Sequence, residues 1–161
     1  MQRRLCAAAA VLIAIGAISP AAAPPAQPVL RLDGNVKTPM RYDANAVRQM
    51  PPMHVDVVYG STRGTVKASF AGALLWSLIA GAGGIADAGH GVEVRHAIRI
   101  TAGDGYVVVL SAGEIAPDVG GKQALIAYER DGKPLDSLWL VMPGDRSDAR
   151  YVHDVTSITV E

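Results

Sequence analysis

The chain has 161 residues, a length typical of one domain. Half of the residues are hydrophobic, which excludes a fully disordered protein because such a chain cannot bury a core. The 15 basic and 15 acidic residues cancel and no basic run stands out, so the composition argues against a nucleic-acid-binding protein.

The N-terminus has the layout of a secretory signal peptide. Arg3 and Arg4 form a short basic region, an apolar run follows from residue 5 to residue 18, and small residues lead to Ala21. The apolar run is shorter than the roughly 20 residues that span a membrane. We therefore expect cleavage after Ala21 rather than a retained anchor, and export to the periplasm. The expected organisation is a signal peptide at 1–21, a proline-rich leader at 22–28 and one domain at 29–161.

The position of the single cysteine limits the cross-links and metal ligands that the mature chain can have. The only cysteine is Cys6, inside the predicted signal peptide, so the mature chain would hold no disulfide and no thiolate metal ligand. Removal of 1–21 also takes away two arginines and leaves 13 basic and 15 acidic residues, a net charge of −2. The histidines lack the clustered spacing of metal ligands and are expected to be structural or exposed: His54, His90, His96 and His153.

The domain alternates short strands with tight turns. Period-2 patterns and turn residues predict strands at 29–36, 55–59, 65–70, 92–100, 106–110, 124–128, 138–142 and 151–160. Asp43 caps a predicted helix that runs to Met50, and a second predicted helix at 71–80 contains Trp76 as a packing residue. Ser111 and Glu114 have the spacing of a capping box, which predicts a third short helix. The class expected is α+β, with a mixed sheet or flattened barrel as its core.

Three local segments carry a family resemblance. They read FAGALLW at 70–76, AGDGY at 102–106, and AYERDGKPL at 127–135 followed by VMPGD at 141–145. In this order and spacing they resemble the oxidoreductase molybdopterin-binding domain, which is the fold of sulfite oxidase and its bacterial relatives. The likeness extends from about residue 30 to residue 160 and implies a fold of the sulfite oxidase type.

One departure from the family pattern changes the function that the resemblance implies. Family enzymes hold molybdenum through a protein thiolate, and neither a hydroxyl nor an imidazole replaces that soft ligand well. The chain is therefore more similar to small periplasmic relatives that bind a metal-free pterin without catalysis, some of which signal to a membrane-bound partner. Two alternatives stay open: a molybdopterin-dependent oxidoreductase domain with a redox partner, and a degenerate fold that serves only as an interaction surface.

A pterin offers a flat ring, an edge of hydrogen-bond donors and a polar tail, which together suggest a pocket. Glu129 is the first candidate to accept from the donor edge, and Asp104 is the second, although a turn aspartate often has only a local role. Tyr106 and Tyr128 are candidates to stack on the ring, or alternatively core residues. The resemblance implies that the tail contacts the loop with Gly144, Asp145, Arg146 and Arg150, whose charges could also be merely solvated. No catalytic or metal-binding residue is predicted.

Overall fold

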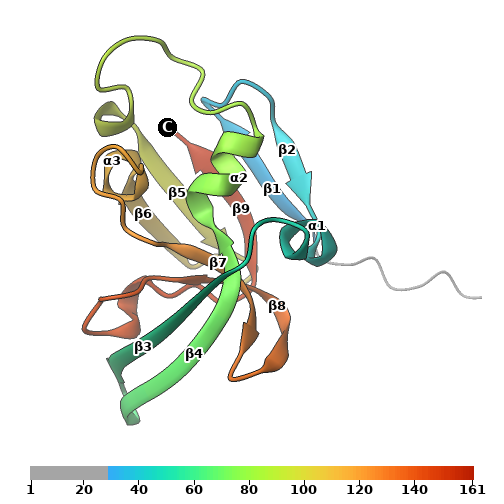
Figure 1. The fold of residues 1–161 in the computed structure, drawn as a ribbon, viewed down its shortest axis with the longest axis vertical. Coiled ribbons are helices and arrows are strands. Elements are labelled where there is room, and N and C mark those ends of the chain that lie inside the picture. The colour runs from blue at the N-terminus through green and yellow to red at the C-terminus, as the bar shows by residue number, and fades with distance from the viewer. Residues whose placement is uncertain (1–28) are drawn as a thin grey trace, which may run out of the picture.

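The structure is a computed structural model that describes residues 29–161, so the predicted signal peptide and leader lie outside the described residues. Two β-sheets and several short helices form the described part, and the sheets do not close into a barrel (Figure 1). The predicted α+β class is confirmed. The core is a pair of sheets and not the flattened barrel that was one of the two expected alternatives.

The first sheet has five strands in the order β2-β1-β9-β5-β6. Its strands are β1 (Leu30–Gly34), β2 (Met40–Tyr42), β5 (Ala97–Ala102), β6 (Val107–Ser111) and β9 (Val155–Val160). β1 and β9 are parallel and the other neighbours are antiparallel, so the sheet is mixed. Side chains alternate between the two faces of a strand, which is why Ile98 and Ile100 of β5 are fully buried while Arg99 between them is not.

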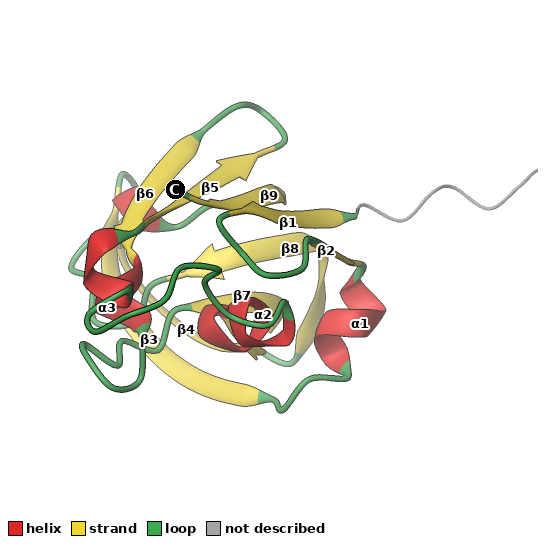
Figure 2. Cartoon of the chain, turned by 90° about the horizontal axis from the view of Figure 1, so that it is seen from above, coloured by secondary structure: helices red, strands yellow, loops and turns green. Residues whose placement is uncertain are grey.

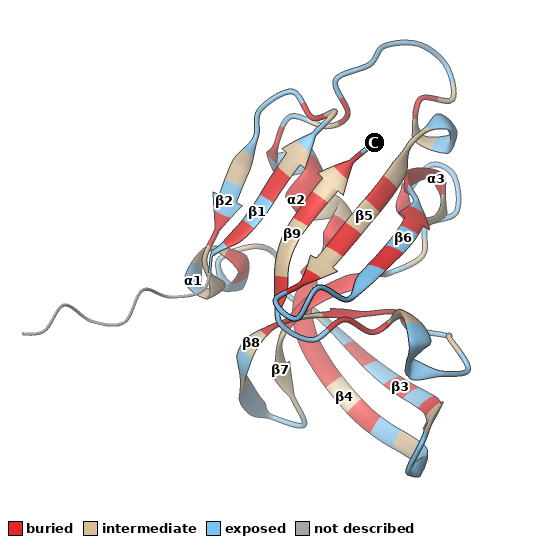
Figure 3. Cartoon of the chain, turned by 180° about the vertical axis from the view of Figure 1, so that it is seen from behind, coloured by how far each residue is buried: buried red, intermediate tan, exposed pale blue. Residues whose placement is uncertain are grey.

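The second sheet has four antiparallel strands in the order β3-β4-β7-β8. They are β3 (Met53–Ser61), β4 (Gly64–Leu74), β7 (Leu125–Arg130) and β8 (Lys133–Val141). The predicted β3–β4 hairpin is confirmed, and its tip projects from the body of the molecule (Figure 3). The predicted turn between β7 and β8 is also confirmed, with positive φ angles of 51° at Asp131 and 74° at Gly132.

Short helices connect the strands (Figure 2). They are the α-helices α1 (Ala44–Arg48), α2 (Leu75–Gly81) and α3 (Ala112–Ile115) and the 3₁₀ helices η1 (Glu93–Arg95) and η2 (Asp148–Arg150). The predicted cap of α1 is confirmed, because the Asp43 carboxylate accepts the Ala46 N–H at 2.7 Å. No helix within residues 29–161 is long and apolar enough to cross a membrane.

The predicted helix at 71–80 begins too early. Residues 71–74 continue β4, because Ala73 pairs with Ile126 and Leu74 with Leu125 on β7. The helix itself starts at Leu75 and buries the predicted apolar side, while Trp76 is half-buried. Sheet pairing across more than 50 residues of sequence therefore overrides the helical period of this segment.

Two predicted strands also begin too early. Residues 93–95 form η1, with Val94 58% exposed, and the β5 ladder starts at Ala97, whose N–H donates to the Glu161 carbonyl. β9 starts at Val155, because Asp154 has a φ of 52°, which a continuous strand cannot contain. In both segments the alternating pattern of apolar and polar residues includes positions at which the backbone is outside the sheet.

Candidate functional site

Two adjoining hollows open beside the loop that follows β8. The larger one, which we call the hairpin hollow, has a volume of about 400 Å³ and lies at the tip of the β3–β4 hairpin; it is lined by Tyr59, Ser61, Thr62, Arg63, Val66, Arg130, Asp148 and His153. The second, the turn hollow, has a volume of about 290 Å³ and is lined by Ala102, Asp104, Tyr106, Asp148, Ala149, Tyr151 and His153. Because Asp148 and His153 line both, the two hollows form one candidate site, of a size common for small-molecule sites.

The β5–β6 turn brings two of the predicted residues to the turn hollow. The Asp104 carboxylate accepts the Tyr106 N–H at 2.9 Å, which is the local turn role expected of an aspartate. The Tyr106 hydroxyl donates to the Ala149 carbonyl at 2.6 Å, so its ring is tied to η2. Asp104 and Tyr106 therefore share a site with the loop after β8, although about half of the Tyr106 side chain stays exposed.

The hairpin hollow carries two guanidinium groups. Arg63 comes from the hairpin turn and Arg130 from the end of β7. Arg130 pairs with Asp131 at 3.2 Å, and its guanidinium carbon lies 5.7 Å from the centroid of the Phe70 ring. Planar guanidinium groups bind carboxylate or phosphate and stack on flat rings. This side of the site therefore suits a flat ligand or an anionic one.

Aromatic rings pack behind the hollows. His153 stacks on Trp139 with ring centroids 3.7 Å apart, and Tyr151 packs against Tyr59 at 4.6 Å. Burial lowers the pKa of His153, and the positive charge of Arg130 lowers it further. The imidazole is therefore predominantly neutral at pH 7.

The hydroxyl of Tyr151 is buried and has no hydrogen-bond partner among the described residues. Burial raises the pKa of Tyr151 to about 12, helped by the nearby charges of Asp145 and Asp148, so the hydroxyl stays protonated. An unsatisfied buried hydroxyl costs stability. Tyr151 lines the turn hollow, so a hydroxyl without a hydrogen-bond partner among the described residues lies beside the candidate site.

Four charged side chains form a compact cluster behind η2. Arg150 donates to Asp145 through Nε and Nη2, both at 2.7 Å, and to both oxygens of Glu114 through Nη1 at 3.0 and 3.1 Å. Lys122 donates to Asp145 at 2.5 Å and lies 3.4 Å from Glu114. Burial would raise the pKa of Asp145, but the hydrogen bonds from Arg150 and Lys122 outweigh it and hold this pKa below its ordinary value. The hydrogen bond to Asp145 in turn raises the pKa of Arg150.

The cluster revises the role expected of Glu114. The α3 helix forms as predicted, but Ser111 makes no side-chain cap bond and the capping box is wrong. Glu114 binds Arg150 and Lys122 instead, because the chain brings η2 next to α3. Of the residues predicted to bind a cofactor, Asp145 and Arg150 bind each other.

Four predicted residues lie elsewhere on the structure. Tyr128 faces a separate hollow of about 290 Å³, where the Arg48 guanidinium lies 5.4 Å from its ring centroid. Glu129 is on β7 beside Arg130 but does not line either hollow of the candidate site. Gly144 forms a turn with a φ of 84°, and Arg146 is exposed, with its carbonyl accepting the Gly60 N–H at 2.8 Å. The structure therefore does not bring the eight predicted residues into one pocket.

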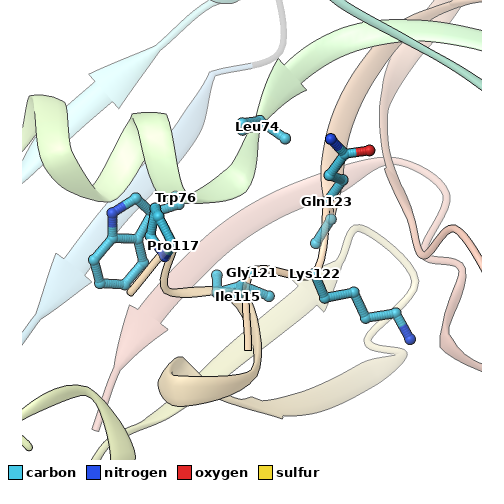
Figure 4. A pocket seen from close by; sticks show the side chains of 8 residues that line it. Leu74, Trp76, Ile115, Pro117, Gly121, Lys122 and Gln123 are labelled. Carbon is cyan, nitrogen blue, oxygen red and sulfur yellow. The ribbon is translucent and has the colours of Figure 1, made fainter. Parts of the chain in front are cut away.

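A further hollow of about 250 Å³ lies between the start of α2 and the loop after α3 (Figure 4). It is largely apolar, and Trp76, Ile115 and Pro117 face it. The side chain of Lys122 runs away from the indole, toward its partners Asp145 and Glu114. This Trp76 hollow is thus separate from the candidate site, and Lys122 is the member of the charged cluster that lines it.

None of the residues that line the hairpin hollow was predicted as a site residue, including its four ionisable side chains other than tyrosine: Arg63, Arg130, Asp148 and His153. They come from three separate parts of the chain, so no single motif contains all four, although Arg130 lies in the AYERDGKPL segment. Within residues 29–161, no group of three or more His, Cys, Asp or Glu side chains is placed to hold a metal ion.

Comparison with known proteins supports the fold. The structure is similar to the sulfane dehydrogenase SoxCD from Paracoccus pantotrophus, with a TM-score of 0.66 and 14% sequence identity. The sulfite oxidase-like fold is confirmed. The match covers 82% of this chain but only 37% of that chain, so the likeness concerns one part of a longer protein. No protein-family model and no curated protein matches the sequence.

Proposed function

We propose that the protein binds a metal-free pterin at the joined hairpin and turn hollows and does not catalyse a reaction. The observation that carries the proposal is the pair of hollows that meet at Asp148 and His153 on a sulfite oxidase-like fold. Together they offer space for a flat ring and a tail, and aromatic, guanidinium and carboxylate groups surround that space.

The donor set of this chain does not fit a molybdenum centre of the sulfite oxidase type. Such a centre takes a protein thiolate, and the sequence from residue 22 onward contains no cysteine. The oxygen and nitrogen donors that line the hollows are harder ligands and are not grouped for a metal. We therefore derive no redox step for this site.

The same residues do fit a pterin. Asp148 and Asp104 offer carboxylates to the donor edge of the ring, and Asp148 lines both hollows. The guanidinium of Arg63 and the rings of Tyr106 and His153 offer flat surfaces for stacking. Asp148 thereby takes the part that the sequence assigned to Glu129.

Purification without added ligand tests the proposal directly. The full chain is expressed in a bacterium with a periplasm, purified, and analysed for metals and for pterin fluorescence after denaturation. A released pterin near one per protein, with no molybdenum, is the expected result. Stoichiometric molybdenum would promote the oxidoreductase alternative, and the absence of both pterin and any pterin-induced rise in melting temperature would favour the interaction-surface alternative.

The proposal includes export and a signalling partner. Mass spectrometry of the mature protein should show a first residue of Ala22, as expected for cleavage after Ala21. A protein that keeps Met1 and sediments with membranes would contradict export as a cleaved periplasmic protein. We further propose a membrane-bound signalling protein as the partner, which crosslinking in intact cells with and without pterin would test.

A further inference from the structure

Arg150 is held by two carboxylates that belong to different parts of the chain. Asp145 binds it as a fork through two nitrogens, and Glu114, 36 residues away on α3, binds the third. The Asp145 side chain is 12% exposed and that of Arg150 is 34% exposed, so this pair is partly buried and is screened less than a fully exposed pair. All three guanidinium nitrogens of Arg150 therefore donate hydrogen bonds to carboxylates of the protein.

The segment that Arg150 belongs to lines the candidate site. Asp148, Ala149 and Tyr151 lie within two residues of Arg150, and all three line the turn hollow. The segment is also attached at Arg146, whose carbonyl accepts the Gly60 N–H, and at Ala149, whose carbonyl accepts the Tyr106 hydroxyl. Arg150 supplies the charged attachment among these contacts.

We propose that Arg150 is a positioning residue for the ligand site: through Asp145 and Glu114 it fixes residues 145–151 so that Asp148 and Tyr151 are already in place when the ligand arrives. The inference rests on the proposed function and deepens it. An ordered site binds more tightly than a mobile one, because the cost of ordering the segment has been met during folding. Arg150 thus acts on the ligand through its neighbours and makes no contact with it.

Two variants and a matched control test this role in the full chain. Arg150→Lys keeps the charge and loses the fork, and Glu114→Gln keeps the size and loses the charge. Arg99→Lys is the control, because Arg99 pairs with Glu161 at 2.5 Å on the far side of the first sheet with both side chains 43% exposed. Each protein is titrated anaerobically with tetrahydrobiopterin, and amide hydrogen exchange is measured without ligand.

The informative amides are those of Tyr151 and Val152, which donate to the Asp148 and Leu140 carbonyls. Both variants should exchange these amides roughly tenfold faster than the wild type and bind tetrahydrobiopterin roughly tenfold more weakly. Exchange in β5 should not change, and Arg99→Lys should match the wild type in both measurements. Such a local effect would separate positioning from a general loss of stability.

Unchanged exchange at Tyr151 and Val152 would overturn the inference, and so would equal acceleration throughout β5 or an equal effect in Arg99→Lys. If wild-type protein does not bind tetrahydrobiopterin, the proposed function fails for this probe. Hydrogen exchange then decides the inference alone, because it reports the order of residues 145–151 without any ligand.

Discussion

The rings of Trp139 and His153 are stacked with centroids 3.7 Å apart and an interplanar angle of 21°, and His153 lines both hollows of the candidate site. A protonated imidazole quenches the fluorescence of an indole in contact with it. Trp139 is therefore an internal reporter of the charge on His153.

We expect the fluorescence of Trp139 to fall as the pH drops below about 6.5, the ordinary pKa of histidine, with a midpoint below that value. Burial and Arg130 lower the pKa of His153, so the unfolded chain binds the proton first and the stability from this group is lost as the pH falls. The measurement uses a Trp76→Phe background, which leaves Trp139 as the only indole. Replacement of His153 by Gln should remove the transition, and a midpoint at or above 6.5 would contradict the shielded environment.

Tyr151→Phe removes a buried hydroxyl that has no partner among the described residues. We expect the free energy of unfolding to stay the same or to rise by up to about 1 kcal/mol, because an unsatisfied polar group is lost. Tyr42→Phe is the matched control, since the Tyr42 hydroxyl donates to the Leu78 carbonyl at 2.9 Å and its loss should cost about 1 kcal/mol. Urea unfolding of both variants gives the comparison. A loss in Tyr151→Phe as large as that in Tyr42→Phe would mean that the hydroxyl already has a partner, such as bound water.

Gly72→Ala should destabilise the second sheet by about 1–3 kcal/mol. At the bulge between Ala71 and Gly72, β4 and β7 approach so closely that a Cβ at Gly72 would collide with the Ile126 carbonyl and the Ala127 backbone. At Gly60 a Cβ would meet only the Arg146 carbonyl at 3.4 Å, so Gly60→Ala is the control and should cost much less. Denaturant midpoints of the two variants decide this, and equal midpoints would contradict the close approach.

Asp145→Asn should reduce the dependence of stability on pH in acid. The folded pKa of Asp145 is lowered, so its stabilising effect is complete above the ordinary carboxyl value of about 4 and is lost as the pH falls through the folded pKa. The wild type should therefore lose stability between pH 4 and more acid pH more steeply than the variant. Asp118→Asn alters an exposed residue that makes no ion pair within residues 29–161 and should follow the wild type. Parallel curves for Asp145→Asn and wild type would contradict this, because they would show that Asp145 has the same pKa in the folded and the unfolded protein.

Asp148→Asn should weaken pterin binding by roughly tenfold, because the carboxylate that lines both hollows loses its charge. Glu129→Gln removes a charge from β7 outside the two hollows and should leave the affinity within about twofold. Calorimetric titration with tetrahydrobiopterin compares the two. A larger loss of affinity in Glu129→Gln than in Asp148→Asn would support Glu129 as the pterin-binding carboxylate, as predicted from the sequence, and would place the binding site outside the two hollows.

Elements whose structure depends on nearby residues could be predicted from the sequence. The Asp43 cap, the β3–β4 hairpin and the Asp131–Gly132 turn each follow from a few adjacent residues, and all three form. The order of the motifs also indicated the fold, because three segments at fixed spacing constrain the topology together. The function that follows from the missing thiol remains a prediction.

Contacts between distant segments could not be predicted in the same way. Residues 71–74 are strand rather than helix because they pair with β7. Glu114 binds Arg150 and does not form the expected capping box, because η2 brings Arg150 next to α3. A carboxylate near a helix start gains more from a partly buried guanidinium than from one backbone N–H, since charge-assisted hydrogen bonds are the stronger ones. The sequence by itself thus determined the local elements and the fold, which depend on short-range preferences and motif order. Only the tertiary structure decided which charges pair and which residues share a hollow, because those depend on the packing of segments that the sequence separates.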